Sequence, residues 1–482
     1  STTCRTYPDA VAQFGGIRQP LGDGIGRCVI AGPVQVQRSV KLVRRCGRHG
    51  RDHTRAVTVR NVAVMVAGRP EPVSQNLAAY SRSRCCRGES RMTLTDELTT
   101  ASLSALVGTG AAHALDFDDY AYSDHVSALL VPAIIADAER TSASGAKMIE
   151  AYLAGYEIWG AIFKREPDHL HSKGWHPTGV FGVLGVVAAL CRLRGLDRNI
   201  CRNALGLAAA SGGGVMDNFG TQAKSYQGAR AAEAGVACVE LALAGIDAGP
   251  HALDGSGGLL AALSPHGTVD LESDAAWLGL NWIAANNSLN LKRHPTVGAS
   301  QRAIDAAIQL HDQHRINPRA IEKVIARVSG KHDAVMRFRR PSSSHEARFS
   351  LEFGVAAGLI SGRVSLQELN DEYVQRNDVQ ALISKVTREI GPDNDPSYPV
   401  GALHDSVRVE LSDGSSIESE KVHRFLGHGE NPMTEAQLKE KFDLCTRTFI
   451  SADQASILYA SLRKLPELAG ANELPTLVFK QH

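Results

Sequence analysis

Hydrophobic residues recur at intervals of three and four through the middle of the chain, which is the spacing of amphipathic helices. The clearest stripe spans residues 145–163, where Met148, Tyr152, Tyr156 and Trp159 share one helix face. Similar patterns predict further helices over residues 103–114, 178–193, 198–211 and 228–245. Because no strand pattern interrupts them, we expect an all-helical domain over residues 95–268.

The hydrophobic pattern changes after this stretch. Residues 324–328 and 406–411 are rich in β-branched side chains, as strands are, and Asp413-Gly414 is typical of a hairpin turn. Helical patterns at 298–314 and 349–361 lie between the two strands. We therefore predict an α+β domain over residues 269–428, followed by helices over 429–482 that return to the first domain. The fold class is mainly α, with a second, smaller α+β domain.

The segment 1–94 has a different character. Its first 91 residues contain fifteen arginines, one lysine and five of the nine cysteines. We find no sustained helical stripe there, only short apolar pieces such as residues 57–66. One interpretation is a basic arm that is poorly ordered or irregular and β-rich. The other is a shifted reading frame up to about residue 90, because a GC-rich gene read out of frame gives Arg-rich, Lys-poor, Cys-rich sequence.

Composition excludes several classes of function. A chain of 482 residues with 43% hydrophobic and 21% charged residues is typical of a two-domain globular protein. The net charge of +1 offers no overall attraction for nucleic acid or membranes. The longest apolar run, 180–191, is too short to cross a bilayer. The cysteines show no Cys-x-x-Cys spacing, and no signal-peptide pattern opens the chain, so we expect a cytoplasmic protein.

Four carboxylates and two imidazoles fall between His113 and His125, in otherwise apolar sequence. Such groups are costly to bury unless they are paired or used. Asp116-x-Asp118-Asp119 matches the acidic motif of terpene cyclases, but only 5% of the residues are aromatic, too few to suggest the lining of such a cavity. The acids could instead bond backbone N–H groups at a helix end. The functional alternative is an acid that orients a histidine, with Asp119 and His125 as the expected pair.

A second polar segment contains Trp175-His176-Pro177 and leads into the helix predicted at 178–193. Helix N–H dipoles favour a neutral imidazole, so His176 is a candidate general base. His169 and His171, with Asp168, could join His176 in a metal cluster. We expect them to be solvated loop residues instead, and we expect no metal and no cofactor.

Two further segments supply positive charge. Lys224 follows a glycine-rich loop, and Lys292-Arg293-His294-Pro295 precedes the helix predicted from residue 298. Paired cations and helix N-termini attract carboxylates. The same sequence would also fit a solvated lysine at Lys224 and a surface basic patch at Lys292-Arg293-His294. Arg348 is either a further cation or the partner of Glu346.

These segments together resemble the MmgE/PrpD family. The order and spacing of the motifs hold from about residue 100 to 450. The resemblance implies a helical domain and a smaller α+β domain with the active site between them, a homodimer, and no metal. It assigns the acid to Asp119, the two histidines to His125 and His176, the site lysine to Lys224 and the clamping cation to Lys292. The matching text is Ala111 to Asp119, Trp175-His176-Pro177, Thr221 to Lys224, Lys292 to Pro295, His345 to Ser350, and Asn431-Pro432 with Lys441-Phe442.

Two departures from the family affect the expected reaction. The chain has Tyr120 where the family often has threonine, and Val297 where the lyases of the family place a histidine, although His294 could substitute. Because an epimerase needs only proton exchange at one carbon, we predict an epimerase acting beside a carboxylate of a small polycarboxylate such as iminodisuccinate. The alternatives are a lyase of the 2-methylcitrate dehydratase type and a non-catalytic binding protein.

The roles expected of the individual residues follow from this reaction. His176 abstracts the proton, Lys224 or His125 returns one to the opposite face, and Asp119 holds one tautomer of His125. The substrate is expected to contact the remaining residues of the set, which are Lys292, Arg293, His294 and Tyr120.

Overall fold

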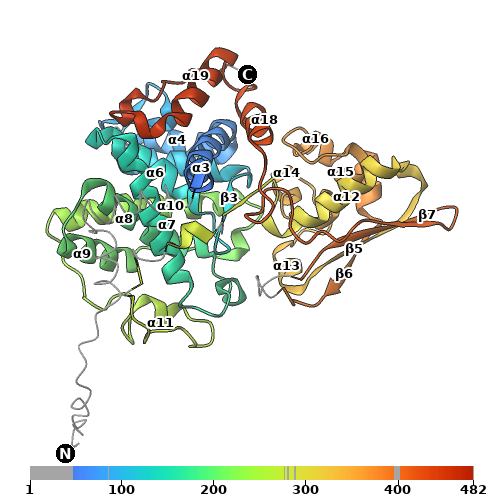
Figure 1. Ribbon diagram of the computed structural model, residues 1–482, viewed down its shortest axis with the longest axis horizontal. Coiled ribbons are helices and arrows are strands. Elements are labelled where there is room, and N and C mark those ends of the chain that lie inside the picture. Colours follow the sequence, from blue (N-terminus) through green and yellow to red (C-terminus); the bar gives the residue numbers. More distant parts are fainter. Residues whose placement is uncertain are drawn as a thin grey trace, which may run out of the picture.

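The computed structural model describes residues 47–480, apart from residues 85, 276, 279–281, 287–288 and 396–401. Two regions lie side by side, a large helical region and a smaller region built on a sheet (Figure 1). The predicted fold class, mainly α with a second α+β part, is confirmed. The boundaries predicted near residues 94, 268 and 428 stay predictions.

The helical region is a bundle whose central helices pack closely on one another. Its members are α3 (Gly47–Gly68), α4 (Pro72–Ser83), α5 (Ala101–Ala114), α6 (Val126–Thr141), α7 (Gly145–Phe163), α8 (Pro177–Arg194), α9 (Arg198–Ala209), α10 (Gln222–Leu243) and the short α11 (Leu259–Leu263). The five helices predicted from periodicity correspond to α5, α7, α8, α9 and α10.

Packing between α7 and α8 shows how sequence sets the core. Ser144 caps α7 by accepting from the backbone N–H of Lys147, and Pro177 occupies the first turn of α8. Trp159 on α7 is fully buried, and its indole ring fills the space beside Gly185 on α8. A Cβ at Gly185 would lie 2.6 Å from that ring, so only glycine allows this approach.

The expectation of an irregular segment before residue 94 is wrong for the part that the structure describes. Helices α3 and α4 occupy it, and residues 57–67 of α3 are buried throughout. A helix surrounded by other helices has no polar stripe, and its valines resemble those of a strand, so periodicity does not reveal it. Residues 1–46, which contain six of the fifteen arginines, lie outside the described residues.

The sheet region carries four strands in the order β6-β5-β7-β8. Strand β5 (Ile321–Ser329) pairs in parallel with β6 (Val386–Gly391) and antiparallel with β7 (Ser406–Leu411), which turns through Asp413-Gly414 into β8 (Ser416–Glu418). The predicted strands are β5 and β7, whereas β6 was not predicted. Helices α12 (Gln301–His314) and α15 (Leu351–Ser361) pack together in this region, and the remaining helices are α13 (Gly330–Val335), α14 (Ser344–Ala347), α16 (Asp371–Val374) and α17 (Asn377–Ile383).

The chain returns to the helical region at its end. Helices α18 (Glu435–Thr446) and α19 (Ala452–Arg463) pack on α3 (Figure 1). Two short ladders occur where no strand was expected, β1 (Ser90–Arg91) with β2 (Leu98–Thr99) and β3 (Asp119–Tyr120) with β4 (Asn290–Leu291). The second ladder places the Asp119 segment beside the segment that leads into Lys292.

One described helix, α8, is long and apolar enough to cross a membrane, but 89% of its apolar window is buried inside the protein. It occupies the position of a core helix of the bundle.

Candidate active site

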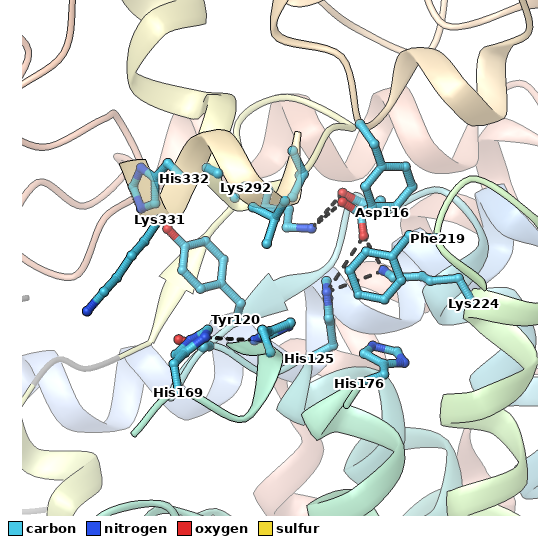
Figure 2. A pocket seen from close by; sticks show the side chains of 17 residues that line it. Asp116, Tyr120, His125, His169, His176, Phe219, Lys224, Lys292, Lys331 and His332 are labelled. Atoms are coloured by element: carbon cyan, nitrogen blue, oxygen red, sulfur yellow. Dashed lines mark hydrogen bonds and ion pairs between the residues drawn. The ribbon is translucent and has the colours of Figure 1, made fainter. Parts of the chain in front are cut away.

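A pocket lies between the helical region and the sheet region (Figure 2). It contains about 720 Å³ of unfilled space, part of it continuous with solvent. One wall comes from the turn after α5 and from the N-terminal ends of α6, α8 and α10. The other wall comes from the residues just before α12 and from α13. Its lining residues are Asp116, Tyr120, Ser123, His125, His169, His171, His176, Phe219, Lys224, Lys292, Val297, Gly298, Ala299, Lys331, His332, Val335 and Phe349.

Asp116 is at the base of the pocket, in the turn that follows α5. Its φ of 50° is in the left-handed region, which aspartate tolerates better than most residues. Its carboxylate accepts from the Nζ of Lys224 and, at 2.8 Å, from the Nζ of Lys292. Burial disfavours the charged carboxylate, but the two lysines outweigh it and lower the pKa of Asp116. Two buried ammonium groups are thus held against one carboxylate.

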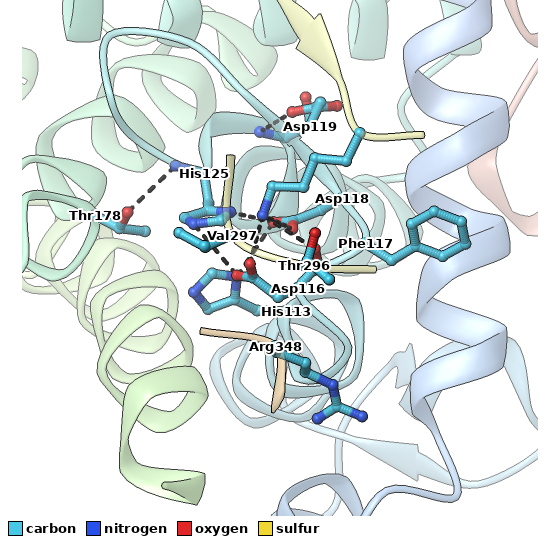
Figure 3. Close-up of polar contacts among 12 residues, drawn as sticks. His113, Asp116, Phe117, Asp118, Asp119, His125, Thr178, Thr296, Val297 and Arg348 are labelled. Carbon is cyan, nitrogen blue, oxygen red and sulfur yellow. Dashed lines mark hydrogen bonds and ion pairs between the residues drawn. The ribbon is translucent and has the colours of Figure 1, made fainter. Parts of the chain in front are cut away.

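Asp118 orients two histidines through one oxygen atom. Its Oδ2 lies 2.8 Å from Nδ1 of His125 and 3.2 Å from Nδ1 of His113 (Figure 3). Burial raises the pKa of Asp118, but His125 and Lys292 outweigh it and hold this pKa well below its usual range. Because a carboxylate only accepts, His125 donates through Nδ1, and its Nε2 carries a lone pair. That Nε2 lies 3.3 Å from the Nζ of Lys224.

Burial lowers the pKa of the histidines at this site, which favours their neutral forms. Burial, opposed by Asp118 and reinforced by Lys224, lowers the pKa of His125 to about 3. Burial and then Lys224 hold the pKa of His176 well below its usual range, and the same two causes lower the pKa of His113. Burial also lowers the pKa of Lys224, against the pull of Asp116.

Asp119 does not contact His125, which corrects the predicted pair. The dashed line from Asp119 in Figure 3 leads to a backbone nitrogen, that of Ser127, at 3.3 Å. Burial, with Asp118 as the second cause, raises the pKa of Asp119 to about 7. The interpretation of the acids as backbone caps therefore fits Asp119, and Asp118 is the residue that orients the histidine.

The cationic segment is divided by the structure. Lys292 lines the pocket, but Arg293 and His294 line a separate cavity behind it. Both of these side chains bond Asp305, at 2.8 and 3.0 Å. Nδ1 of His294 also lies 3.0 Å from the carbonyl oxygen of Val364, so His294 does not replace the histidine missing at Val297.

Several other predictions about site residues have outcomes. His125, His176, Lys224, Lys292 and Tyr120 all line the pocket. His169 and His171, expected to be solvated, are half-buried lining residues whose Nδ1 atoms lie 3.0 Å apart. Asp168 bonds His266 and Thr268 instead of joining them. Arg348 bonds Glu71 and the carbonyl oxygen of Ala114, not Glu346.

Sequence reasoning missed the wall that the sheet region supplies. Lys331 and His332 of α13 line the pocket from that region (Figure 2). The ring of Phe349 lines it from the same region, and the ring of Phe219, which was also missed, lines it from the loop before α10. The sequence around Lys331 and His332 carries no motif. Only the fold brings it opposite His125.

One group of side chains has the composition of a metal site. Ligand atoms of His113, Asp116, Asp118 and His125 lie within 4.8 Å of one another. Asp116 is already neutralised by two ammonium groups, and the Nδ1 atoms of both histidines are directed at Asp118. The arrangement fits an ion-paired proton-transfer site better than a cation site.

Comparisons with known proteins agree with this architecture. Residues 48–272 match the family model described as the MmgE/PrpD N-terminal domain, and residues 294–464 match the MmgE/PrpD C-terminal domain. Human cis-aconitate decarboxylase is 29% identical over 388 residues, covering 78% of this chain and 79% of the relative. The cis-aconitate decarboxylase of Aspergillus terreus is 26% identical over 364 residues, covering 70% and 73%.

A shorter match connects the chain to a different activity. The 2-methylcitrate dehydratase of Salmonella typhi is 29% identical over 175 residues, covering 34% of this chain and 36% of the relative. The matched relatives are thus enzymes that are named for small polycarboxylates. With both domain models matched in order along the chain, the protein belongs to the MmgE/PrpD family.

Proposed function

We propose that the protein is a lyase that decarboxylates a small unsaturated polycarboxylate such as cis-aconitate. The observation that carries this proposal is the pair of buried ammonium groups, Lys224 and Lys292, fixed on Asp116 at the base of the pocket. An ammonium group has three N–H donors. Lys224 contacts Asp116 and His125, and Lys292 contacts two oxygens of Asp116, so each retains a donor for a substrate carboxylate.

The chemistry of the reaction suits this arrangement. The carboxylate that leaves belongs to a β,γ-unsaturated acid, in which the double bond joins the β and γ carbons. When this carboxylate leaves as CO₂, the electron pair of the broken carbon–carbon bond forms a new double bond between the α and β carbons. The electron pair of the old double bond then takes up a proton. Negative charge develops on the oxygens of a retained carboxylate, where preorganised cationic donors are most effective. Lys224 and Lys292 are suited to stabilise that charge.

The proton must come from a group that releases it readily near neutral pH. Burial lowers the pKa of Lys224, so its ammonium is a better acid than a solvated lysine. Lys224 would protonate the carbon and become a neutral amine. His125, 3.3 Å away and oriented by Asp118, would relay a proton from solvent to restore the ammonium.

Epimerisation remains a second candidate, because Val297 lines the pocket where the lyases of the family place a histidine. The absence of a histidine at position 297 is a weaker argument for epimerisation because His332 supplies an imidazole from the same wall. A cytoplasmic location and a homodimer are further parts of the proposal, to be tested by cell fractionation and light scattering.

The charge-based part of the proposal has a matched control in adjacent residues. Lys292→Met should lower CO₂ release from cis-aconitate by about 10²–10³-fold, the loss expected for one site donor. Arg293→Met removes the neighbouring cation, which bonds Asp305 away from the pocket, and should leave CO₂ release unchanged. Equal losses in both variants, or none in Lys292→Met, would contradict the proposal.

A further inference from the structure

His176 has unequal surroundings at its two ring nitrogens. It is the residue before the first turn of α8, and its ring packs edge-to-face on Phe219 at the pocket. Nδ1 lies 2.9 Å from the side-chain Nε2 of Gln227. Nε2 is buried and has no hydrogen-bond partner among the residues that the structure describes. The proton of the neutral ring can occupy either nitrogen, and Gln227 determines which.

Two backbone groups fix the orientation of the Gln227 amide. Its Oε1 accepts from the backbone N–H of Val215 at 2.7 Å, and its Nε2 donates to the carbonyl oxygen of Val215 at 3.2 Å. The Nδ2 of Asn218 also donates to Oε1 at 2.7 Å. A backbone N–H is always a donor and a carbonyl always an acceptor, so the amide cannot be turned over. The nitrogen of Gln227 therefore faces His176.

A donor at Nδ1 requires that this nitrogen of His176 accept. The proton of the neutral ring is then on Nε2. His125 has the opposite arrangement, because Asp118 accepts from its Nδ1 and leaves a lone pair on Nε2. His125 and His176 thus differ in tautomer, one suited to accept a proton and the other suited to donate a hydrogen bond.

We propose that Gln227 is a positioning residue that holds His176 as the Nε2–H tautomer, so that His176 donates a hydrogen bond to a substrate oxygen and does not abstract a proton. This proposal rests on the proposed polycarboxylate substrate only for the identity of that oxygen. It replaces the role of base expected for His176 from the sequence and leaves proton transfer to His125 and Lys224. A neutral imidazole donor suits an oxygen on which charge develops during the reaction.

The tautomer can be measured without any substrate. In protein labelled with ¹⁵N-histidine, long-range proton–nitrogen NMR spectra distinguish protonated from unprotonated ring nitrogens. The chain has 18 histidines, so the His176 signals are identified by their loss in His176→Gln. We expect Nε2 protonated and Nδ1 unprotonated at pH 7. A protonated Nδ1 with a bare Nε2 would overturn the proposal, whatever reaction the enzyme catalyses.

Variants test whether the tautomer matters for turnover. Gln227→Glu replaces the donor by an acceptor, so we expect the proton to move to Nδ1 and kcat to fall by about 10²–10³-fold with a smaller change in KM. His176→Gln keeps an N–H donor but cannot act as a base, so it should retain at least ~10-fold more activity than His176→Ala. Equal activity of the two His176 variants, or a normal kcat in Gln227→Glu with the proton on Nδ1, would contradict the proposal. If wild-type His176 is protonated on Nε2 but the protein turns over no polycarboxylate, the result would count against the proposed function and not against this tautomer.

Discussion

Replacing Asp118 by asparagine removes the group that orients His125. The carboxylate accepts from His125 and His113 through one oxygen, and its other oxygen lies 3.8 Å from the Nζ of Lys292. An asparagine must direct its NH₂ group either at Nδ1 of His125 or at the ammonium of Lys292. The first orientation forces the proton of His125 onto Nε2, and the second places a donor against a cation.

The size of the effect follows from these two outcomes. In a catalytic triad, the loss of the correct tautomer through an Asp-to-Asn change costs about 10⁴-fold in kcat. A base or proton relay contributes roughly 10²–10⁴-fold. We therefore expect Asp118→Asn to lower kcat by about 10²–10⁴-fold, equivalent to about 3–5 kcal/mol of transition-state stabilisation.

The neighbouring acid provides the control. Asp119 is equally buried, but it bonds the backbone of Ser127 and does not contact His125. Asp119→Asn should keep kcat within a few-fold of wild type. Steady-state CO₂ release is measured for wild type and both variants, with circular dichroism to confirm folding. The reasoning fails if Asp118→Asn keeps a tenth of wild-type turnover, or if the two variants lose the same amount.

Three further predictions concern charge and stability. Lys224→Ala should lose at least ~100-fold in kcat at unchanged fold, the loss expected for one site donor, and near-normal turnover would remove Lys224 from the mechanism. Burial, then Asp118, raises the pKa of Asp119 to about 7, whereas the unfolded chain releases this proton near pH 4. The folded state thus binds the extra proton between pH 4 and 7, and wild type loses stability as pH rises through this interval. Urea titrations should show Asp119→Asn gaining stability relative to wild type up to about pH 7 and no further, and a pH-independent difference would contradict this. Arg348→Met should lower the free energy of unfolding by about 1–3 kcal/mol, because its guanidinium bonds Glu71 and the carbonyl oxygen of Ala114 across the two regions, and a loss below about 0.5 kcal/mol would refute that role.

Much of the fold could be predicted from periodicity. The stripe of residues 145–163 corresponds to α7 residue for residue, and the strand predicted at 406–411 corresponds to β7. Helix α3 was missed because the described inner half of this helix is buried on all sides, and α6 was missed because its first fourteen residues are buried in the same way. Pattern analysis depends on a contrast between faces that such helices lack.

The candidate site was predictable to the level of segments, and less so to individual side chains. Polar motifs in apolar sequence identified the segments of Lys292 and Asp119. Neighbouring residues on a locally extended chain point in opposite directions, so a motif does not show which of two adjacent side chains faces the pocket. The turn at Asp116, with its positive φ, sets which of the following acids meets His125. Neither composition nor spacing reveals that turn. The sequence pattern therefore pairs Asp119, and not Asp118, with His125, and it assigns Arg293 to the pocket together with Lys292.

The central claim is that this pocket performs lyase chemistry on a small polycarboxylate. Proton NMR in D₂O, with purified protein and cis-aconitate, 2-methylcitrate, citrate and iminodisuccinate, tests it most directly. We predict that cis-aconitate loses CO₂ and gives the two vinylic signals of a new methylene group, with deuterium at the former vinylic carbon, which becomes the saturated carbon of the product. Deuterium exchange at the α-carbon of iminodisuccinate, with stereoisomers equilibrating and cis-aconitate untouched, would contradict the lyase and establish an epimerase. Alkene formation from 2-methylcitrate alone would identify a dehydratase, and no change in any substrate would favour a binding protein.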